Sequence, residues 1–95
     1  MISLSTHVLD TGAGAPALDV LVRLQRGEEM LAEQRTDADG RARLAEDLAP
    51  GAYRLVFHLP SPFFRRVELE VELEEGHYHI PLLVSPYSCT SYRGS

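Results

Sequence analysis

Apolar side chains recur at every second residue through most of this chain, and this period restricts its fold more than any other feature. The clearest case is Val67–Leu73, where Val and Leu alternate with Glu. Successive side chains of a strand point to opposite faces, so this pattern predicts a β-strand with one buried face. Only Glu28–Gln34 could equally form a short helix. The same period occurs in Leu4–Leu9, Leu18–Gln25, Tyr53–Leu59 and His77–Val84.

Turn-forming residues separate these segments at the spacing typical of an all-β sandwich. Asp39-Gly40 is a strong hairpin signal, because glycine adopts positive φ without steric cost. Pro60 and Pro62 disfavour a helix between Phe57 and Val67, where we expect aromatic side chains to cap the end of the sandwich. We expect seven or eight antiparallel strands in two packed sheets, forming a single domain over residues 1–95.

Composition and charge exclude several classes of function. The chain has 14 acidic and nine basic residues, a net charge of −5, and all its basic residues are arginine. Five glutamates between positions 68 and 75 would repel a phosphate backbone, which argues against nucleic-acid binding. No apolar run approaches the roughly 18 residues of a membrane span. The single Cys89 allows no internal disulfide or thiolate zinc site, so we expect a reduced, cytoplasmic protein.

The outward faces of two segments do not resemble the surface of a monomer. Near the end of the chain one such face carries His77, His79, Pro81 and Leu83, and near the start another carries His7 and Leu9. A solvated face should carry charged side chains, as the glutamates of Val67–Leu73 do. Histidines mixed with apolar side chains predict a face that another subunit covers or that lines a pocket.

Four short motifs follow one another along the chain: Ser5-Thr6-His7-Val8-Leu9-Asp10, Asp39-Gly40-Arg41, His77-Tyr78-His79-Ile80-Pro81-Leu82-Leu83 and Tyr92-Arg93-Gly94-Ser95. Each motif alone is weak evidence for a family. Together, and in this order, they resemble the motifs of the 5-hydroxyisourate hydrolases, which are transthyretin-related enzymes of purine breakdown. The resemblance implies a transthyretin-like β-sandwich of two four-stranded antiparallel sheets. We expect the family's usual short helix to be reduced or absent, because residues 58–66 are too few for a helix and two loops. It implies a homotetramer, a dimer of dimers. The segments 58–66 and 88–91 depart from the family pattern.

The resemblance also implies an activity and its residues. The reaction is hydrolysis of 5-hydroxyisourate to 2-oxo-4-hydroxy-4-carboxy-5-ureidoimidazoline, with no metal or organic cofactor. His7, Arg41 and His79 would be catalytic, and His77 would be accessory. Histidine exchanges protons readily near neutral pH, so one histidine could activate water while the other protonates the leaving nitrogen. The sequence leaves open which does which. The residues implied to bind the small-molecule substrate are His7, Arg41, Tyr92 and Ser95.

Other interpretations of these residues compete. His7 could be an ordinary histidine on a sheet face, and with His77 and His79 it could complete three ligands for zinc. Cys89 could be a nucleophile, although the alternation points it away from the histidine face, as expected of a buried thiol. Asp10 could act as a base, although its place before a turn favours a structural role.

Two other functions compete with the hydrolase. A transthyretin-like carrier would bind a small aromatic ligand without reaction, but the two histidines and the arginine argue for chemistry. A structural prealbumin-like module is the third interpretation, because residues 36–53 also resemble small sandwich domains appended to larger proteins. Such a module would not explain the paired histidines or the final tetrapeptide.

Overall fold

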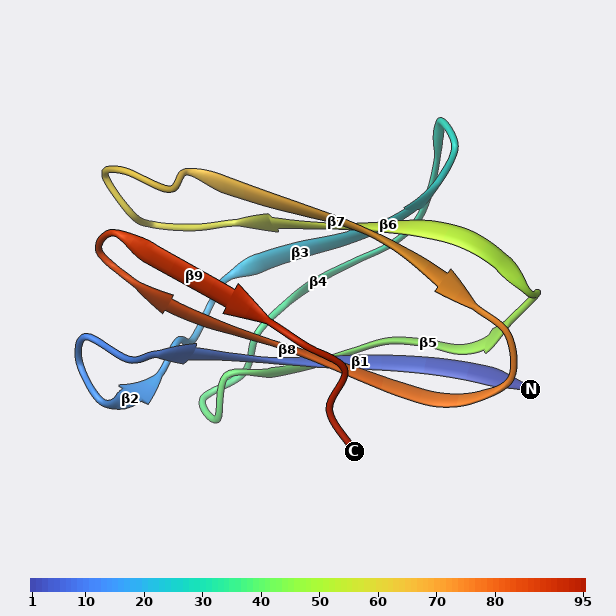
Figure 1. Cartoon of the computed structure of the whole chain (residues 1–95), viewed down its shortest axis with the longest axis horizontal. Coiled ribbons are helices and arrows are strands. Elements are labelled where there is room, and N and C mark those ends of the chain that lie inside the picture. Colours follow the sequence, from blue (N-terminus) through green and yellow to red (C-terminus); the bar gives the residue numbers. More distant parts are fainter.

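The computed structural model describes every residue from Met1 to Ser95 and contains nine strands and no helix. Figure 1 shows two layers, a four-stranded sheet above a five-stranded one. The upper sheet contains β3 (Leu21–Arg26), β4 (Glu29–Arg35), β6 (Gly51–His58) and β7 (Arg66–Leu73). The lower sheet contains β1 (Ile2–Asp10), β2 (Ala15–Pro16), β5 (Arg41–Leu48), β8 (Gly76–Ser85) and β9 (Ser88–Ser91). The all-β sandwich is therefore confirmed, and the segment 28–34 belongs to a strand.

The two sheets differ in strand direction. The upper sheet, in the order β4-β3-β6-β7, is antiparallel throughout. In the lower sheet β1 runs parallel to β8, while β5 and the two-residue β2 pair with the other edge of β1. The expected antiparallel sheets of four strands are thus modified by one short extra strand and one parallel pair. A two-residue period does not encode direction, and the chain between β1 and β8 supplies the long crossover that parallel strands need.

The hydrophobic core lies between the sheets and contains the inward-facing half of each alternating segment. Along β1 the inward residues are Ile2, Leu4, Thr6 and Val8, all fully buried. The buried Thr6 hydroxyl donates a hydrogen bond of 2.6 Å to the carbonyl of Ile80. The one polar inward side chain of β1 is therefore hydrogen-bonded within the sheet, as buried polar groups usually are.

Two local expectations were wrong in detail. Leu18 does not continue the buried face of the next strand but is 63% exposed, because Asp19 has φ of 62° and interrupts the alternation. Asp39-Gly40 forms a turn but not a hairpin, because it joins β4 to β5 in the other sheet. Gly40 has φ of 79°, and a Cβ there would overlap the carbonyl oxygen of Val8. The turn thus requires glycine and packs closely against β1.

The segment between β6 and β7 contains no helix, as its two prolines predict. Phe64 packs against the core, whereas Phe63 is 60% exposed and contacts the ring of Tyr87. Only one of the two phenylalanines therefore caps the sandwich. Since no helix is present, no segment qualifies as a membrane-spanning helix.

Candidate active site

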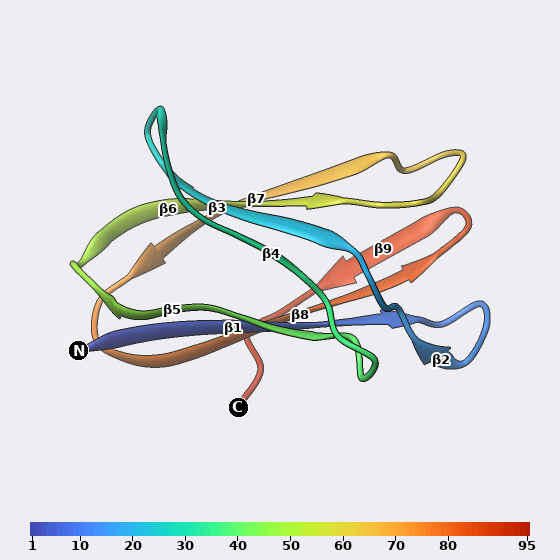
Figure 2. The same cartoon turned by 180° about the vertical axis from the view of Figure 1, so that it is seen from behind.

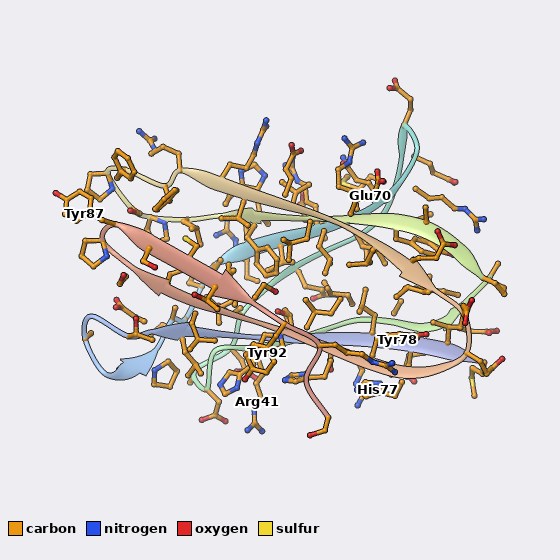
Figure 3. The ribbon with its side chains drawn as sticks, in the orientation of Figure 1. Arg41, Glu70, His77, Tyr78, Tyr87 and Tyr92 are labelled. Carbon is orange, nitrogen blue, oxygen red and sulfur yellow. The ribbon has the colours of Figure 1, made fainter.

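The outward face of the five-stranded sheet brings the predicted histidines and arginine together. β1 is central, and Figure 2 shows β5 and β8 running beside it. The register sets His7 opposite Arg41 on β5 and Ser5 opposite His79 on β8. Residues two apart in a strand share a face, so the three strands present these four side chains on one surface. Figure 3 shows Arg41 and His77 on the lower, outward side of this sheet.

A cavity of about 420 Å³ opens on this face. Most of the predicted site residues line it, and His7 stands beside it, its ring centre 6.4 Å from that of His79. The cavity carries hydrogen-bonding groups on almost every side and is therefore suited to a small polar ligand. The lining residues are Ser5, Thr6, Asp37, Arg41, Ala42, Arg43, His77, His79 and Ser95.

His7 is held by the turn before β5. Its Nε2 lies 2.8 Å from the carbonyl oxygen of Asp39. A carbonyl oxygen can only accept, so Nε2 carries the proton and donates it. The other ring nitrogen, Nδ1, is then left with a lone pair, which is the form of histidine that can accept a proton from water.

His79 is half-buried, and its surroundings favour the neutral ring. Its pKa is lowered first by burial, then by the nearby charges of His7, His77 and Arg41. The terminal tail covers part of the residue: Gly94 donates a backbone hydrogen bond of 2.6 Å to the carbonyl of His79. A neutral ring in a partly covered position can exchange protons without holding a permanent charge.

Arg41 differs from the other arginine of the cavity. Arg43 donates a hydrogen bond of 2.8 Å to the carboxylate of Glu46, which neutralises its charge. The guanidinium of Arg41 forms no ion pair or side-chain hydrogen bond within the chain. A free planar guanidinium beside a cavity can bind carbonyl oxygens or an anion with two parallel hydrogen bonds.

Asp37 is a cavity residue that the sequence interpretation missed. Its carboxylate accepts hydrogen bonds of 2.9 Å from the backbone N–H groups of Asp39 and Arg41. The bond from Arg41 is the main cause of its lowered pKa, and the charges of Arg41 and His7 lower it further. Asp37 thus fixes the turn that holds His7. Its signal in the sequence was its place two residues before Asp39-Gly40, where aspartate commonly bonds the turn backbone.

Tyr92 is set apart from the other predicted residues within one chain. It is 56% exposed and lines a different cavity, of about 370 Å³, next to β7 and Tyr78. Ser88 and Thr90 precede Tyr92 at two-residue intervals along the chain, but they line neither cavity. Ser95 does line the histidine cavity, so the terminal tetrapeptide reaches both.

The competing interpretations can be compared with the same geometry. His7, His77 and His79 do not form a group arranged to hold a metal ion. Cys89 packs against the core, and burial raises the pKa of its thiol. The Asp10 carboxylate accepts a hydrogen bond of 3.0 Å from the backbone N–H of Ala13, as a turn residue should. Neither Cys89 nor Asp10 lines the histidine cavity.

Comparison with known proteins identifies the family. The model of the HIUase/Transthyretin family matches residues 4–94. The chain belongs to this family. A 5-hydroxyisourate hydrolase of Caulobacter vibrioides is 46% identical over 115 residues, with all of both chains covered. The alignment is longer than the 95 residues present here, so it contains gaps in this chain.

Solved structures of the HIUase/Transthyretin family have the same fold. The structure of Klebsiella pneumoniae 5-hydroxyisourate hydrolase matches with a TM-score of 0.91 and 37% identity, covering all of both chains. Sea bream transthyretin in complex with thyroxine matches with a TM-score of 0.87 and 28% identity, covering 96% of this chain and 93% of that one. The family thus contains both an enzyme and a ligand-binding protein on one sandwich.

Proposed function

We propose that this chain hydrolyses 5-hydroxyisourate, opening its six-membered ring to give 2-oxo-4-hydroxy-4-carboxy-5-ureidoimidazoline in urate degradation. Its relatives named as 5-hydroxyisourate hydrolases support this activity. The observation that carries the proposal is the outward face of the five-stranded sheet, where two histidines 6.4 Å apart share a surface with an unpaired arginine. Hydrolysis of a cyclic amide needs both a proton acceptor and a proton donor.

In this mechanism His7 is the base and His79 is the acid. The Nδ1 lone pair of His7 takes a proton from water, whose oxygen bonds to the ring carbonyl carbon. The carbon–nitrogen bond then breaks, and His79 supplies a proton to the departing nitrogen. Arg41 holds the carbonyl oxygens and stabilises the negative charge that develops on them. These steps use only side chains of the chain itself.

The terminal tetrapeptide completes the substrate site in this proposal. Ser95 lines the histidine cavity and is placed to hydrogen-bond a polar ring. Tyr92 lies at the neighbouring cavity, from which it would contact the substrate at the edge of the site. His77 lines the same cavity, but in this proposal it is accessory and acts on the reaction through its neighbours.

The ultraviolet decay of freshly generated 5-hydroxyisourate tests the activity. The wild-type chain should accelerate the decay catalytically, at protein concentrations far below that of the substrate. The double variant His7→Ala/His79→Ala is the matched control and should leave the spontaneous rate unchanged. A carrier would leave the decay unchanged or slow it, and its effect would be proportional to its own concentration. Either result would contradict the proposal.

We further propose that four chains assemble as a dimer of dimers, with the histidine face turned toward a neighbouring subunit. Leu9 and Leu83 lie opposite each other in the register and are only half-buried on this face. Covering such apolar side chains is a common reason for closed symmetric assembly. Light scattering should give four times the 10.6 kDa of one chain. A stable monomer at micromolar concentration would contradict the assembly.

The half-buried thiol of Cys89 is compatible with the cytoplasmic location that we propose.

A further inference from the structure

An unbroken chain of hydrogen bonds links His79 to the exposed His77 along the outward face. The Ser5 hydroxyl lies 2.9 Å from His79 Nδ1 and 3.2 Å from His77 Nε2. The other ring nitrogen of His77, Nδ1, lies 2.6 Å from the hydroxyl of Ser3. The parallel register explains this arrangement, because it sets Ser3 opposite His77 and Ser5 opposite His79.

We propose that Ser5 and His77 form a proton-delivery chain that resupplies His79 from the surface. This inference rests on the proposed hydrolase function and names two positioning residues for it. Both residues line the cavity, but their proposed role is to pass protons to His79 and not to bind the substrate. Each acts on the nitrogen of His79 that faces away from the reaction, since Nδ1 is engaged with Ser5 and Nε2 is left for the substrate.

The chemistry of the chain is directional because a serine hydroxyl has a single proton. When Ser5 donates to Nδ1 of His79, its oxygen accepts from Nε2–H of His77, and Nδ1 of His77 accepts from Ser3. His79 then carries its own proton on Nε2. As Nε2 gives this proton to the leaving nitrogen, Nδ1 receives one from Ser5, and Ser5 receives one from Nε2 of His77. Nδ1 of His77 takes a proton from Ser3 in the same step, and Ser3 is reprotonated from solvent. One proton leaves the chain and one enters it.

Without such a supply, a neutral histidine is a poor acid. Losing its only ring proton would leave an imidazolate anion, which a half-buried position cannot solvate well. The surroundings of His79 keep it in the neutral form, as its lowered pKa indicates. The hydroxyl of Ser5 removes this difficulty, because Nδ1 gains a proton in the same step in which Nε2 loses one.

The charged surroundings favour solvent as the proton source. The titratable and charged groups that face the two histidines are His7 on β1, Arg41 and Arg43 on β5, Asp37 in the preceding turn, and Arg93 in the tail. Three of these are arginines, which do not give up protons near neutral pH. Asp37 is a poor proton source because its lowered pKa keeps it ionised. His77 is exposed and can exchange its proton with water.

Ser5→Ala tests the chain by removing both hydrogen bonds to its hydroxyl. In this variant only the protonated imidazolium of His79 can act as an acid, so kcat should fall more steeply as the pH rises. We expect a loss of about tenfold at pH 8 and a smaller loss at pH 6, below the roughly 10²–10⁴-fold of a complete acid–base contribution. Ser5→Thr keeps a hydroxyl and should restore the profile. Ser85→Ala removes a serine from the far end of β8 and is the matched control.

His77→Gln separates proton delivery from orientation. The glutamine amide can donate a hydrogen bond to Ser5 but cannot pass a proton on. It should therefore show the same pH-dependent loss as Ser5→Ala. A pH-independent ratio of wild-type to variant kcat, or wild-type rates in both variants, would overturn the proposal.

Nitrogen-15 NMR of the histidine rings gives a readout that does not depend on turnover. The balance between the two neutral tautomers of His79 should differ between the wild type and His77→Gln. In a chain that already carries Ser5→Ala, His77→Gln should no longer change this balance. If the wild-type chain fails to hydrolyse 5-hydroxyisourate, the proposed function fails, and this spectrum still decides on the hydrogen-bond chain. Identical His79 signals in the wild type, Ser5→Ala and His77→Gln would overturn it.

Discussion

The outward faces of the two sheets obey the same two-residue alternation but carry different chemistry. On the four-stranded sheet the outward face carries ion pairs: Arg23 donates a hydrogen bond of 2.6 Å to the carboxylate of Glu33 across β3 and β4, and Glu68 lies 4.0 Å from Arg66. Exposed ion pairs of this kind contribute about 0–1 kcal/mol each. On the five-stranded sheet serines and histidines form a hydrogen-bonded chain beside a cavity.

This difference predicts that the outward half of a strand pattern, and not its buried half, carries the function. Burying the inward residues stabilises both sheets alike, so the fold does not depend on which polar residues point outward. The charged face would tolerate exchange of one residue for another. The histidine face would not, because its groups are linked to one another and to the turn that follows β4. Substitutions of the same kind on both faces therefore test the interpretation directly.

The largest contrast should come from removing the histidines. His7→Ala and His79→Ala should each lower kcat for 5-hydroxyisourate by about 10²–10⁴-fold, since each removes one partner in proton transfer. Glu68→Ala, on the charged face, should leave kcat unchanged. Circular dichroism and light scattering should show folded, assembled protein in all three. Wild-type turnover by either histidine variant would contradict the site.

A smaller effect should follow from changing the shape of one cation. Arg41→Lys keeps the positive charge but loses the planar pair of donors, so kcat/KM should fall about tenfold or more through poorer substrate placement. Arg23→Lys makes the same exchange on the charged face and should have no effect. Steady-state kinetics on both variants make the comparison. Equal activity in both would show that the free guanidinium of Arg41 has no special role.

The sequence predicted the strands and their faces well because both depend on local alternation. His7 and His79 were assigned to outward faces, and Val67–Leu73 to a half-buried strand, from that period alone. Placing Arg41 with them needed the family motifs as well, since an arginine after a turn has no pattern of its own.

Pairing between distant strands could not be predicted in the same way. The parallel register of β1 and β8 arises from packing of the whole sandwich, and it alone sets Ser5 between two histidines. Asp39-Gly40 indicated a turn but not the sheet to which the chain would turn. The position of Tyr92 depends on the irregular tail after β9, where alternation ends.

The tail offers a finer test of the histidine face. A Cβ at Gly94 would lie 2.8 Å from Cδ2 and 3.2 Å from the carbonyl oxygen of His79. Gly94→Ala should therefore displace either the tail or the ring, and kcat should fall severalfold. The melting temperature should stay the same, because the tail lies outside the core. Unchanged kinetics would show that the fit of the tail over His79 is not needed for turnover.

The smallest expected effect is on stability, and its sign follows from the lowered pKa of His79. A pKa below the ordinary value of about 6.5 means that the unfolded chain binds a proton more readily than the folded one. The free energy of unfolding should therefore decrease as the pH falls through the interval between the ordinary and the folded pKa. The slope from one group cannot exceed about 1.4 kcal/mol per pH unit.

Urea unfolding between pH 5 and 8 measures this slope. His79→Gln removes the titrating group, so the unfolding free energy should depend less on pH around 6.5 than in the wild type. Glu68→Ala leaves all four histidines in place and should keep the wild-type slope in the same interval. The comparison isolates the histidine face, because both variants remove an outward side chain from a sheet and only one alters the chain of hydrogen bonds. Equal slopes in the wild type and His79→Gln would mean that the folded structure does not favour the neutral ring.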